Sequence, residues 1–184
     1  PEVSVQAPPT PNKKIIRRRA VDLSQSRFTT RLPPILERIY LARGVSDDEQ
    51  LQLRLDGLHK PETFKGLDEA VRLLVEAVYQ QQRVLIIGDF DADGATSCAL
   101  AVLALQAMGL ESVDYLVPNR FDYGYGLTPE IVAVAAGRKP DILITVDNGI
   151  SSFEGVVEAQ ARGMKVIITD HHLPGDRIPP ADAI

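Results

Sequence analysis

The feature that most constrains the fold is a regular alternation of short apolar segments and helical segments that begins at Arg83. The apolar segments are rich in β-branched residues, and Asp114 is the only charged residue within them. They cover residues 84–87, 113–117, 142–146 and 166–168, and the helical segments between them cover 96–108, 128–136 and 153–162. Strands that are apolar on both faces and alternate with helices are typical of a parallel sheet covered on both sides. We therefore predict a doubly wound α/β domain with right-handed crossovers and helices on both faces.

The residues before this alternation follow a different pattern. We predict an N-terminal extension over 1–65 and the α/β domain over 66–184. Residues 1–12 are rich in Pro and small polar residues, which is typical of a disordered or extended start. Helices are expected after Pro33-Pro34, from the capping pattern Ser46–Glu49 to about Leu55, and after Gly66.

Charge is distributed unevenly along the chain. Residues 1–60 hold 11 basic and 7 acidic side chains, a balance of +4, whereas residues 61–184 hold 9 and 18, a balance of −9. An acidic domain argues against a nucleic-acid partner unless its carboxylates hold cations. The basic cluster Lys13–Arg19 near the start is most simply a solvated tail.

The cysteine count and the apolar runs indicate where in the cell the protein is expected. A single Cys among 184 residues excludes a disulfide framework and indicates a reducing compartment. No apolar run approaches the ~20 residues of a membrane span, and the start lacks the pattern of a signal peptide. We therefore expect a cytoplasmic protein without a membrane partner. Because the chain begins with Pro1 rather than Met, we expect it to be part of something longer.

Functional residues of open parallel sheets gather past the carboxyl ends of the strands, and the first loop there carries three aspartates. Asp89, Asp91 and Asp93 alternate, so in an extended segment they share one face. Carboxylates this close repel one another by several kcal/mol, which a divalent cation would relieve. The pattern also opens EF-hand loops, but position twelve is Leu100 rather than Glu, and a strand precedes the loop.

Two further loops strengthen the metal interpretation over that of a solvated acidic turn. Asp147 and Asp170-His171-His172 follow the third and fourth predicted strands. Asp and His together suit Mn²⁺, Mg²⁺ or Zn²⁺, and the mixture favours Mn²⁺. A carboxylate that bridges two ions ~3.5–4 Å apart would make a two-metal hydrolase site.

Candidate substrate contacts lie in the second and third loops. Arg120, next to Asn119, offers a planar fork for a phosphate, although an ordinary surface Arg is the alternative. Asn148 and Ser151 precede a predicted helix, where donors form a natural anion site. Simple turn and capping chemistry explains these two residues equally well.

Four motifs together resemble those of the DHH phosphoesterase superfamily, named for the sequence seen here as Asp170-His171-His172. They are GDFDADGAT, LVPNRFDYGYGL, TVDNGISS and TDHHLPGD. The sequences of these motifs are most similar to those of the single-strand-specific 5′→3′ DNA exonucleases of the superfamily. The resemblance extends from about residue 30 to the end of the chain. The resemblance implies Mn²⁺- or Mg²⁺-dependent release of 5′-mononucleotides from the 5′ end of single-stranded DNA, in recombination and repair. It also implies repair and single-strand-binding proteins as candidate partners.

The resemblance implies a role for individual residues. It makes Asp91, Asp93, Asp147 and His171 metal ligands, with Asp147 as the bridging carboxylate. It places His172 near the scissile phosphate and Arg120 at the 5′-phosphate. Many members carry a His at the position of Ile87, so one coordination position is expected to be either vacant or filled by Asp89 or water.

The family also supplies a further Asp ligand and a second lobe downstream of the DHH motif. Because this sequence includes neither, we expect the chain to fold but to bind DNA weakly and cleave poorly by itself. One alternative is another DHH phosphoesterase, acting on short oligoribonucleotides, cyclic dinucleotides or pyrophosphate. The other is a non-catalytic nucleic-acid-binding member. The long second motif favours the exonuclease, and the retained ligand residues argue against the non-catalytic protein.

Overall fold

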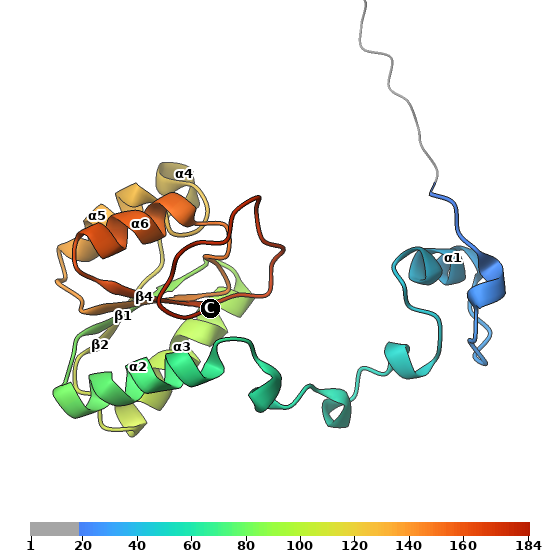
Figure 1. The fold of residues 1–184 in the computed structure, drawn as a ribbon, viewed down its shortest axis with the longest axis horizontal. Helices are drawn as coiled ribbons and strands as arrows, with labels where there is room; N and C mark the ends of the chain where they lie inside the picture. Colours follow the sequence, from blue (N-terminus) through green and yellow to red (C-terminus); the bar gives the residue numbers. More distant parts are fainter. Residues whose placement is uncertain (1–18) are drawn as a thin grey trace, which may run out of the picture. The chain divides into compact units, whose positions relative to one another are not determined.

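The computed structural model describes residues 19–184, except for the side chain of Arg120 (Figure 1). The predicted disordered start and most of the basic cluster Lys13–Arg19 therefore lie outside the described residues. The chain divides between His59 and Lys60 into two compact units. The domain boundary expected between residues 65 and 66 stays a prediction.

Within its described residues, 19–59, the N-terminal unit contains one α-helix, α1 (Pro34–Ala42), which begins after Pro33 as predicted, and three short 3₁₀ turns. These turns are η1 (Leu23–Gln25), η2 (Glu49–Leu51) and η3 (Leu55–Gly57). Its helical elements have no buried residue. Polar contacts link its loops instead, since the carboxylate of Asp48 accepts hydrogen bonds from the backbone N–H and the hydroxyl of Thr29, both at 2.6 Å.

The helix expected from Ser46 to about Leu55 does not form, which corrects the sequence-based prediction. The Ser46 backbone N–H donates to Gln50 Oε1 at 2.7 Å, so the capping-box bond to Glu49 is replaced. Leu53 and Leu55 are 98 % and 86 % exposed. A short helix needs an apolar face packed against a partner, and these residues have no such packing.

The second unit is the predicted parallel α/β domain. Its four strands pair in the order β2-β1-β3-β4, and every pair is parallel. The strands are β1 (Val84–Gly88), β2 (Val113–Leu116), β3 (Ile142–Val146) and β4 (Lys165–Thr169). The other elements are η4 (Pro61–Thr63), α2 (Leu67–Gln80), α3 (Ala92–Ala107), α4 (Arg120–Tyr123), α5 (Pro129–Ala136) and α6 (Phe153–Ala161).

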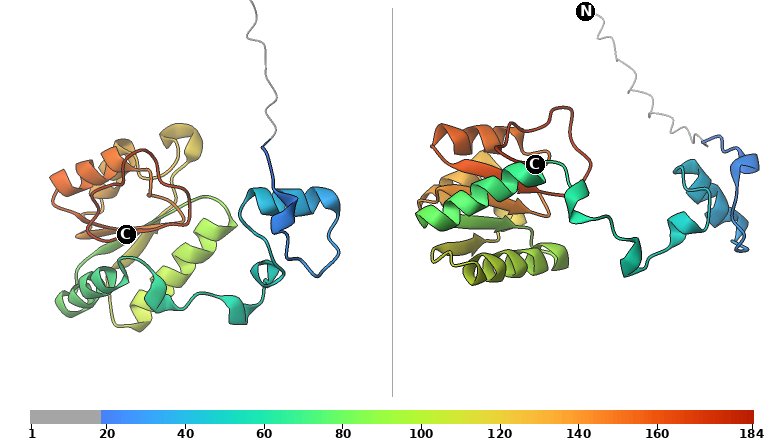
Figure 2. Two further views of the ribbon diagram at one scale, coloured as in Figure 1. Left: turned by 45° about the vertical axis from the view of Figure 1, so that its right-hand side comes forward. Right: turned by 60° about the horizontal axis from the view of Figure 1, so that its bottom comes forward.

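Helices cover both faces of this sheet, as predicted. Figures 1 and 2 show α2 and α3 on one side and α5 and α6 on the other. The strands serve both layers because successive side chains point to opposite faces. Val84 and Ile86 pack with α2 and α3, whereas Leu85 and Ile87 pack with α5 and α6. This double burial explains why β1 and β3 are almost entirely apolar, whereas the edge strand β2 includes the exposed Asp114 and Tyr115.

The strand order places a switch point between β1 and β3. The chain runs from β1 through α3 to β2 on one side, and from β3 through α6 to β4 on the other. Gly88 and Val146 are paired at the carboxyl ends of these two strands. The loops that begin with Asp89 and Asp147 therefore leave the sheet at the same level, at the crevice where such folds bind ligands.

Helix α3 begins at Ala92, four residues before the predicted start. Asp91 is its N-cap, and its side chain accepts a hydrogen bond from Gly94 N–H at 3.1 Å. Asp93 lies in the first helical turn, so the three aspartates do not share one face of an extended segment. Gly94 does not delay the helix: a Cβ there would lie 2.3 Å from Asp89 O, so the glycine allows the close approach.

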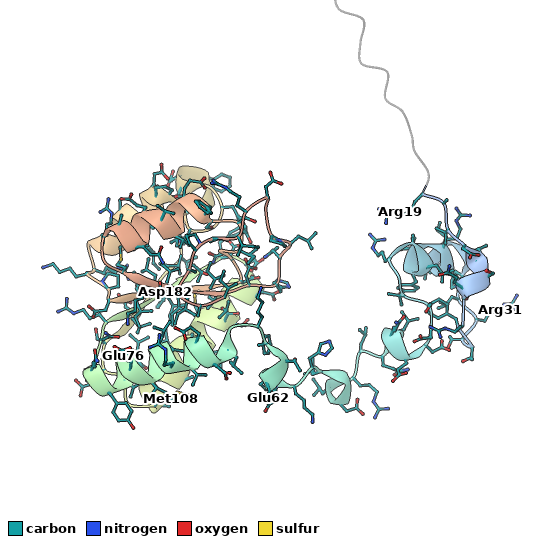
Figure 3. All side chains as sticks on the ribbon, in the orientation of Figure 1. Arg19, Arg31, Glu62, Glu76, Met108 and Asp182 are labelled. Carbon is teal, nitrogen blue, oxygen red and sulfur yellow. The ribbon has the colours of Figure 1, made fainter. Side chains whose placement is uncertain are left out.

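The far edge of the sheet is extended by the last described residues. Ala183 forms a parallel bridge with Ile167, and the side chain of Asp182, labelled in Figure 3, accepts a hydrogen bond from Val166 N–H at 2.8 Å. Between residues 19 and 184, no helix is both long and apolar enough to cross a lipid bilayer.

Candidate metal and active site

Asp147 is the centre of the site because its backbone carries the side chain from the end of β3 into the crevice. The residue has a positive φ of 62°, which is uncommon for a residue other than glycine. Its N–H donates to Thr169 O at 3.0 Å, and its side chain is only 7 % exposed. The β3–β4 ladder thus continues one residue past the strand and fixes this carboxylate.

The carboxylate of Asp170 holds the DHH loop in place through hydrogen bonds. Its side chain is 2 % exposed, and each carboxylate oxygen has a partner. Oδ2 accepts from Ile150 N–H at 2.9 Å. Oδ1 accepts from the N–H groups of His171 and His172 at 2.7 and 3.0 Å, and lies 2.7 Å from His172 Nδ1. This buried carboxylate is an anchor for both histidines.

The anchored loop brings both imidazoles to Asp147. His171 Nε2 lies 2.9 Å from Asp147 Oδ1, and the two histidine rings are 4.7 Å apart. Asp147, His171 and His172 each offer one ligand atom, and these three atoms lie within 4.8 Å of one another. The predicted convergence of carboxylate and imidazole groups is therefore present between β3 and β4.

Asp93 joins this group from the first turn of α3. It lines an open pocket of about 340 Å³ together with Thr96, Asp147 and His171. Burial raises the pKa of Asp147, the hydrogen bond from His171 opposes that rise, and the charges of Asp91 and Asp93 add to it. A buried carboxylate whose charged form is disfavoured by neighbouring acids lies in an environment that a divalent cation stabilises.

The second carboxylate–imidazole pair titrates differently. Burial raises the pKa of Asp170, but hydrogen bonds from Ile150, His172 and His171 outweigh that effect and leave the pKa below its usual value. The hydrogen bond to Asp170 raises the pKa of His172. Asp170 therefore stays ionised and orients the ring of His172.

Tyr125 is a site residue that sequence reasoning missed. Its hydroxyl donates to Asp147 O at 3.2 Å and lies 3.3 Å from His172 Nδ1. Tyr125 stands between Gly124 and Gly126, which have φ angles of 77° and 76°. A polar aromatic residue between two glycines in a strand-end loop was the available signal.

The remaining predicted residues take varied positions. Asn148 is 2 % exposed and donates to Ile87 O and Val146 O at 3.1 and 2.9 Å, so it ties together the ends of β1 and β3. Asn119 Oδ1 accepts from Phe121 N–H at 3.0 Å, at the start of α4. Ser151 is exposed, and its neighbour Ser152 is the one that accepts from Leu127 N–H.

Two further residues that the sequence predicted to be functional lie in the loops that follow β1 and β2. Asp89 is half-buried, and its Oδ1 accepts from Phe90 N–H at 2.8 Å. Arg120 begins α4, and its side chain lies outside the described residues.

Comparison with known families decides where this arrangement belongs. Residues 83–184, the whole region from β1 onward, match the model of the DHH family, N-terminal domain. The chain belongs to the DHH family. Its name-giving motif is the loop in which Asp170 anchors His171 and His172.

DHH-family relatives match most of the chain. It is 48% identical over 172 residues to the single-stranded-DNA-specific exonuclease RecJ of Haemophilus influenzae, and 48% identical over 169 residues to that of Escherichia coli. These matches cover 94% and 92% of this chain but only 29% of either relative. The chain thus spans less than a third of the length of the curated relatives it matches.

Solved structures agree in fold. A crystal structure of exonuclease RecJ bound to manganese matches with a TM-score of 0.59 and 42% identity, over 64% of this chain and 30% of the other. RecJ from Thermus thermophilus in complex with Mn²⁺ matches with a TM-score of 0.58 and 32% identity, over 86% and 24%. The parallel sheet with its helices is therefore the DHH-family arrangement.

Proposed function

We propose that this chain supplies the metal-holding domain of a single-stranded-DNA-specific 5′→3′ exonuclease that releases 5′-mononucleotides in DNA recombination and repair. The observation that carries the proposal is the meeting of Asp93, Asp147 and His171 around one pocket at the switch point of the sheet. The names and bound manganese of the similar proteins support it.

The donor set fits a divalent cation. Asp147, His171 and His172 place ligand atoms within 4.8 Å of one another, and Asp91 and Asp93 add negative charge near Asp147. Carboxylates with imidazole suit Mn²⁺, and Mg²⁺ accepts the carboxylates. We propose that Asp91, Asp93, Asp147 and His171 hold Mn²⁺ or Mg²⁺, with His172 beside them. When bound, such an ion supplies positive charge that stabilises the charge developing on phosphoryl oxygens.

The chain's own groups would position the substrate. Because His172 Nδ1 faces Asp170 at 2.7 Å, we assign its Nε2, which lies 3.5 Å from the Tyr125 hydroxyl, to meet a phosphoryl oxygen. We assign Asp89 to the reacting end together with His172. We assign Arg120, Asn119 and Ser151 to holding the 5′ end of the strand, whereas Asn148 keeps the ends of β1 and β3 together.

The test is cleavage by the longer protein that contains this chain. We expect Asp147→Asn and His171→Ala to abolish Mn²⁺-dependent release of mononucleotides from 5′-phosphorylated single-stranded DNA, by about 10³-fold or more, with the fold intact by circular dichroism. Asp176→Asn, in the exposed part of the loop after the DHH motif, is the matched control.

Near-normal rates in either site variant would contradict the assignment. Dinucleotides, cyclic dinucleotides and pyrophosphate serve as competing substrates in the same assay. Faster hydrolysis of one of these than of a long single strand would assign the site to another DHH phosphoesterase. An intact site with no hydrolysis of any substrate would favour a non-catalytic binding protein.

A further inference from the structure

Helix α3 is apolar around its whole circumference, although only one side of it faces the sheet. It has no charged residue between positions 94 and 107. Its inner side packs in the core through Cys98 and Leu105, whereas Leu100 and Leu103 are 70 % and 65 % exposed. A helix that is apolar all round is typical of an element buried on every side. The outer side of α3 therefore has the composition of a buried surface.

A first groove runs between α2 and α3, which Figures 1 and 2 show on the same face of the sheet. It has a volume of about 410 Å³. The residues that line it are Val71, Leu74, Val75, Val78 and Tyr79 of α2, Leu105 of α3, and Met108, which is labelled in Figure 3. The α2 residues recur at helical spacing, so the groove follows that helix for about two turns, or ~12 Å. It has the length and the lining that a short amphipathic helix needs.

A second groove lies on the other side of α3, against the edge strand β2. It has a volume of about 470 Å³. The residues that line it are Ala95, Cys98, Ala99, Val102, Leu103, Tyr115 and Val117. Because α3 contributes a wall to both grooves, the two form one apolar surface with the exposed Leu100 between them. We call this the α2–α3 surface.

The α2–α3 surface carries no charge for a polar partner. Neither groove is lined by a charged side chain. On α2, Arg72 pairs with Glu69 and Glu76. Glu76, labelled in Figure 3, also pairs with Lys165 at 3.5 Å, so these charges lie on the side of α2 towards β4. A partner that fits this surface is therefore apolar rather than a nucleic acid or an acidic peptide.

A further part of the same polypeptide is the partner that the observations favour. More than two thirds of each similar RecJ protein lies outside the match, since the match covers 29% of either relative. The backbone of Ile184 lies against the start of α2, because a Cβ on Gly66 would be 2.2 Å from Ile184 O. A segment that continues from Ile184 thus starts beside the first turn of α2. Contact within one polypeptide also covers an apolar surface at any protein concentration.

We propose that the α2–α3 surface docks an amphipathic helix from a further part of the longer polypeptide, with its apolar side chains in the two grooves. Helices pack in this way when the ridges of one fill the grooves of another. The docked helix holds α3 from its outer side, and α3 carries Asp93 into the metal-binding crevice. The proposal does not depend on which reaction the site performs.

The experiment measures alkylation of introduced cysteines by N-ethylmaleimide, in the 184-residue chain and in the longer protein that contains it. Val75→Cys reports on the first groove and Leu103→Cys on the second, and these side chains are 48 % and 65 % exposed. Val157→Cys is the matched control, on α6 at the opposite face of the sheet and 44 % exposed. The native Cys98 is buried, and mass spectrometry of the labelled peptides separates it from the introduced thiols.

All three introduced cysteines should react rapidly in the 184-residue chain. In the longer protein we expect Val75→Cys and Leu103→Cys to react at least about tenfold more slowly, which corresponds to a docking free energy of about 1.4 kcal/mol. Val157→Cys should keep its rate. The slowing should be the same over about a hundredfold range of protein concentration, because contact within one polypeptide does not depend on concentration.

Other results would overturn the proposal. Rapid reaction of both groove cysteines in the longer protein would leave the surface to a separate partner. Slow reaction already in the 184-residue chain, or slowing that grows with concentration, would mean that this chain itself or a second copy covers the surface. Equal slowing of Val157→Cys would show that the protection is not specific to the α2–α3 surface.

The apolar character of the contact has a test of its own in the longer protein. Adding Leu103→Asp to Val75→Cys should restore alkylation to within about threefold of its rate in the 184-residue chain, because a buried unpaired charge opposes docking. Adding Val157→Asp instead should leave the protection unchanged. Circular dichroism checks that both double variants fold. Full protection in the presence of Leu103→Asp would contradict an apolar partner in the second groove.

Discussion

Asp170 offers the sharpest test of how the site is built, through the substitution Asp170→Ala. The carboxylate is 2 % exposed and holds three backbone N–H groups, those of Ile150, His171 and His172, at 2.7 to 3.0 Å. Alanine removes the acceptor from all three groups at once. It also frees the imidazole of His172 from its partner at 2.7 Å.

The magnitude follows from these contacts. Hydrogen bonds to a charged acceptor contribute about 1.5 kcal/mol each or more, so three backbone bonds sum to about 4.5 kcal/mol. Two effects reduce this figure. The buried carboxylate no longer has to be desolvated, and water reaches the N–H groups of the exposed His171 and His172. We therefore expect a loss of about 2–3 kcal/mol in the free energy of unfolding.

Urea unfolding followed by circular dichroism at 222 nm measures this loss, because most of the helix lies in the α/β unit. Hydrogen exchange at Ile150, His171 and His172 should speed up in the same variant. Asp176→Ala, in the exposed loop that follows, is the control and should stay within about 0.5 kcal/mol of the parent. A loss below about 0.5 kcal/mol for Asp170→Ala would mean that the carboxylate does not anchor the DHH loop.

Three further predictions concern other parts of the molecule. Gly155→Ala should cost about 2 kcal/mol or more in the same urea experiment, because its Cβ would lie 1.8 Å from Leu127 O; a neutral effect would mean that α6 and its neighbouring loop are not in contact. Mn²⁺ at about 100 times its dissociation constant should raise the free energy of unfolding by about 2.7 kcal/mol. The gain should vanish in Asp147→Asn, and an equal gain there would place the ion elsewhere. Hydrogen bonds from Thr29 and Thr30 lower the pKa of Asp48 from 3.8 to about 2, so its contribution to stability is present above pH 3.8 and is lost as the pH falls through about 2; in an NMR titration of the carboxyl carbon, Thr29→Ala should return the pKa towards 3.8, and an unshifted value in the parent would refute the contacts.

Strands β1 and β3 were predictable because their burial on both faces leaves a nearly continuous apolar run. The predicted segment 142–146 coincides with β3 (Ile142–Val146), in which Thr145 is the one polar residue and is β-branched. The helix start at Ala92 was not predictable from local preference. Gly94 normally indicates a turn, and only the close approach of Asp89 to its backbone makes glycine necessary inside the first helical turn.

The candidate site was predictable in outline because parallel strands deliver their following loops to one edge. Asp147 and His171 met as expected, at 2.9 Å. The anchoring role of Asp170 was not foreseen, because it depends on the backbone N–H of Ile150, twenty residues away. The helix predicted after Ser46 does not form. A capping pattern alone does not predict a helix, because a short helix also needs an apolar partner to pack against.

The left-handed backbone of Asp147 has a consequence for how the domain can change over time. At this φ of 62°, glycine is the residue that the main chain itself prefers, and an aspartate is kept only for what its oxygens do. A related domain that no longer uses those oxygens would gain folding stability if glycine replaced the aspartate. Inspecting this single position in other copies of the domain should therefore separate those still under selection for chemistry from those retained as scaffolds.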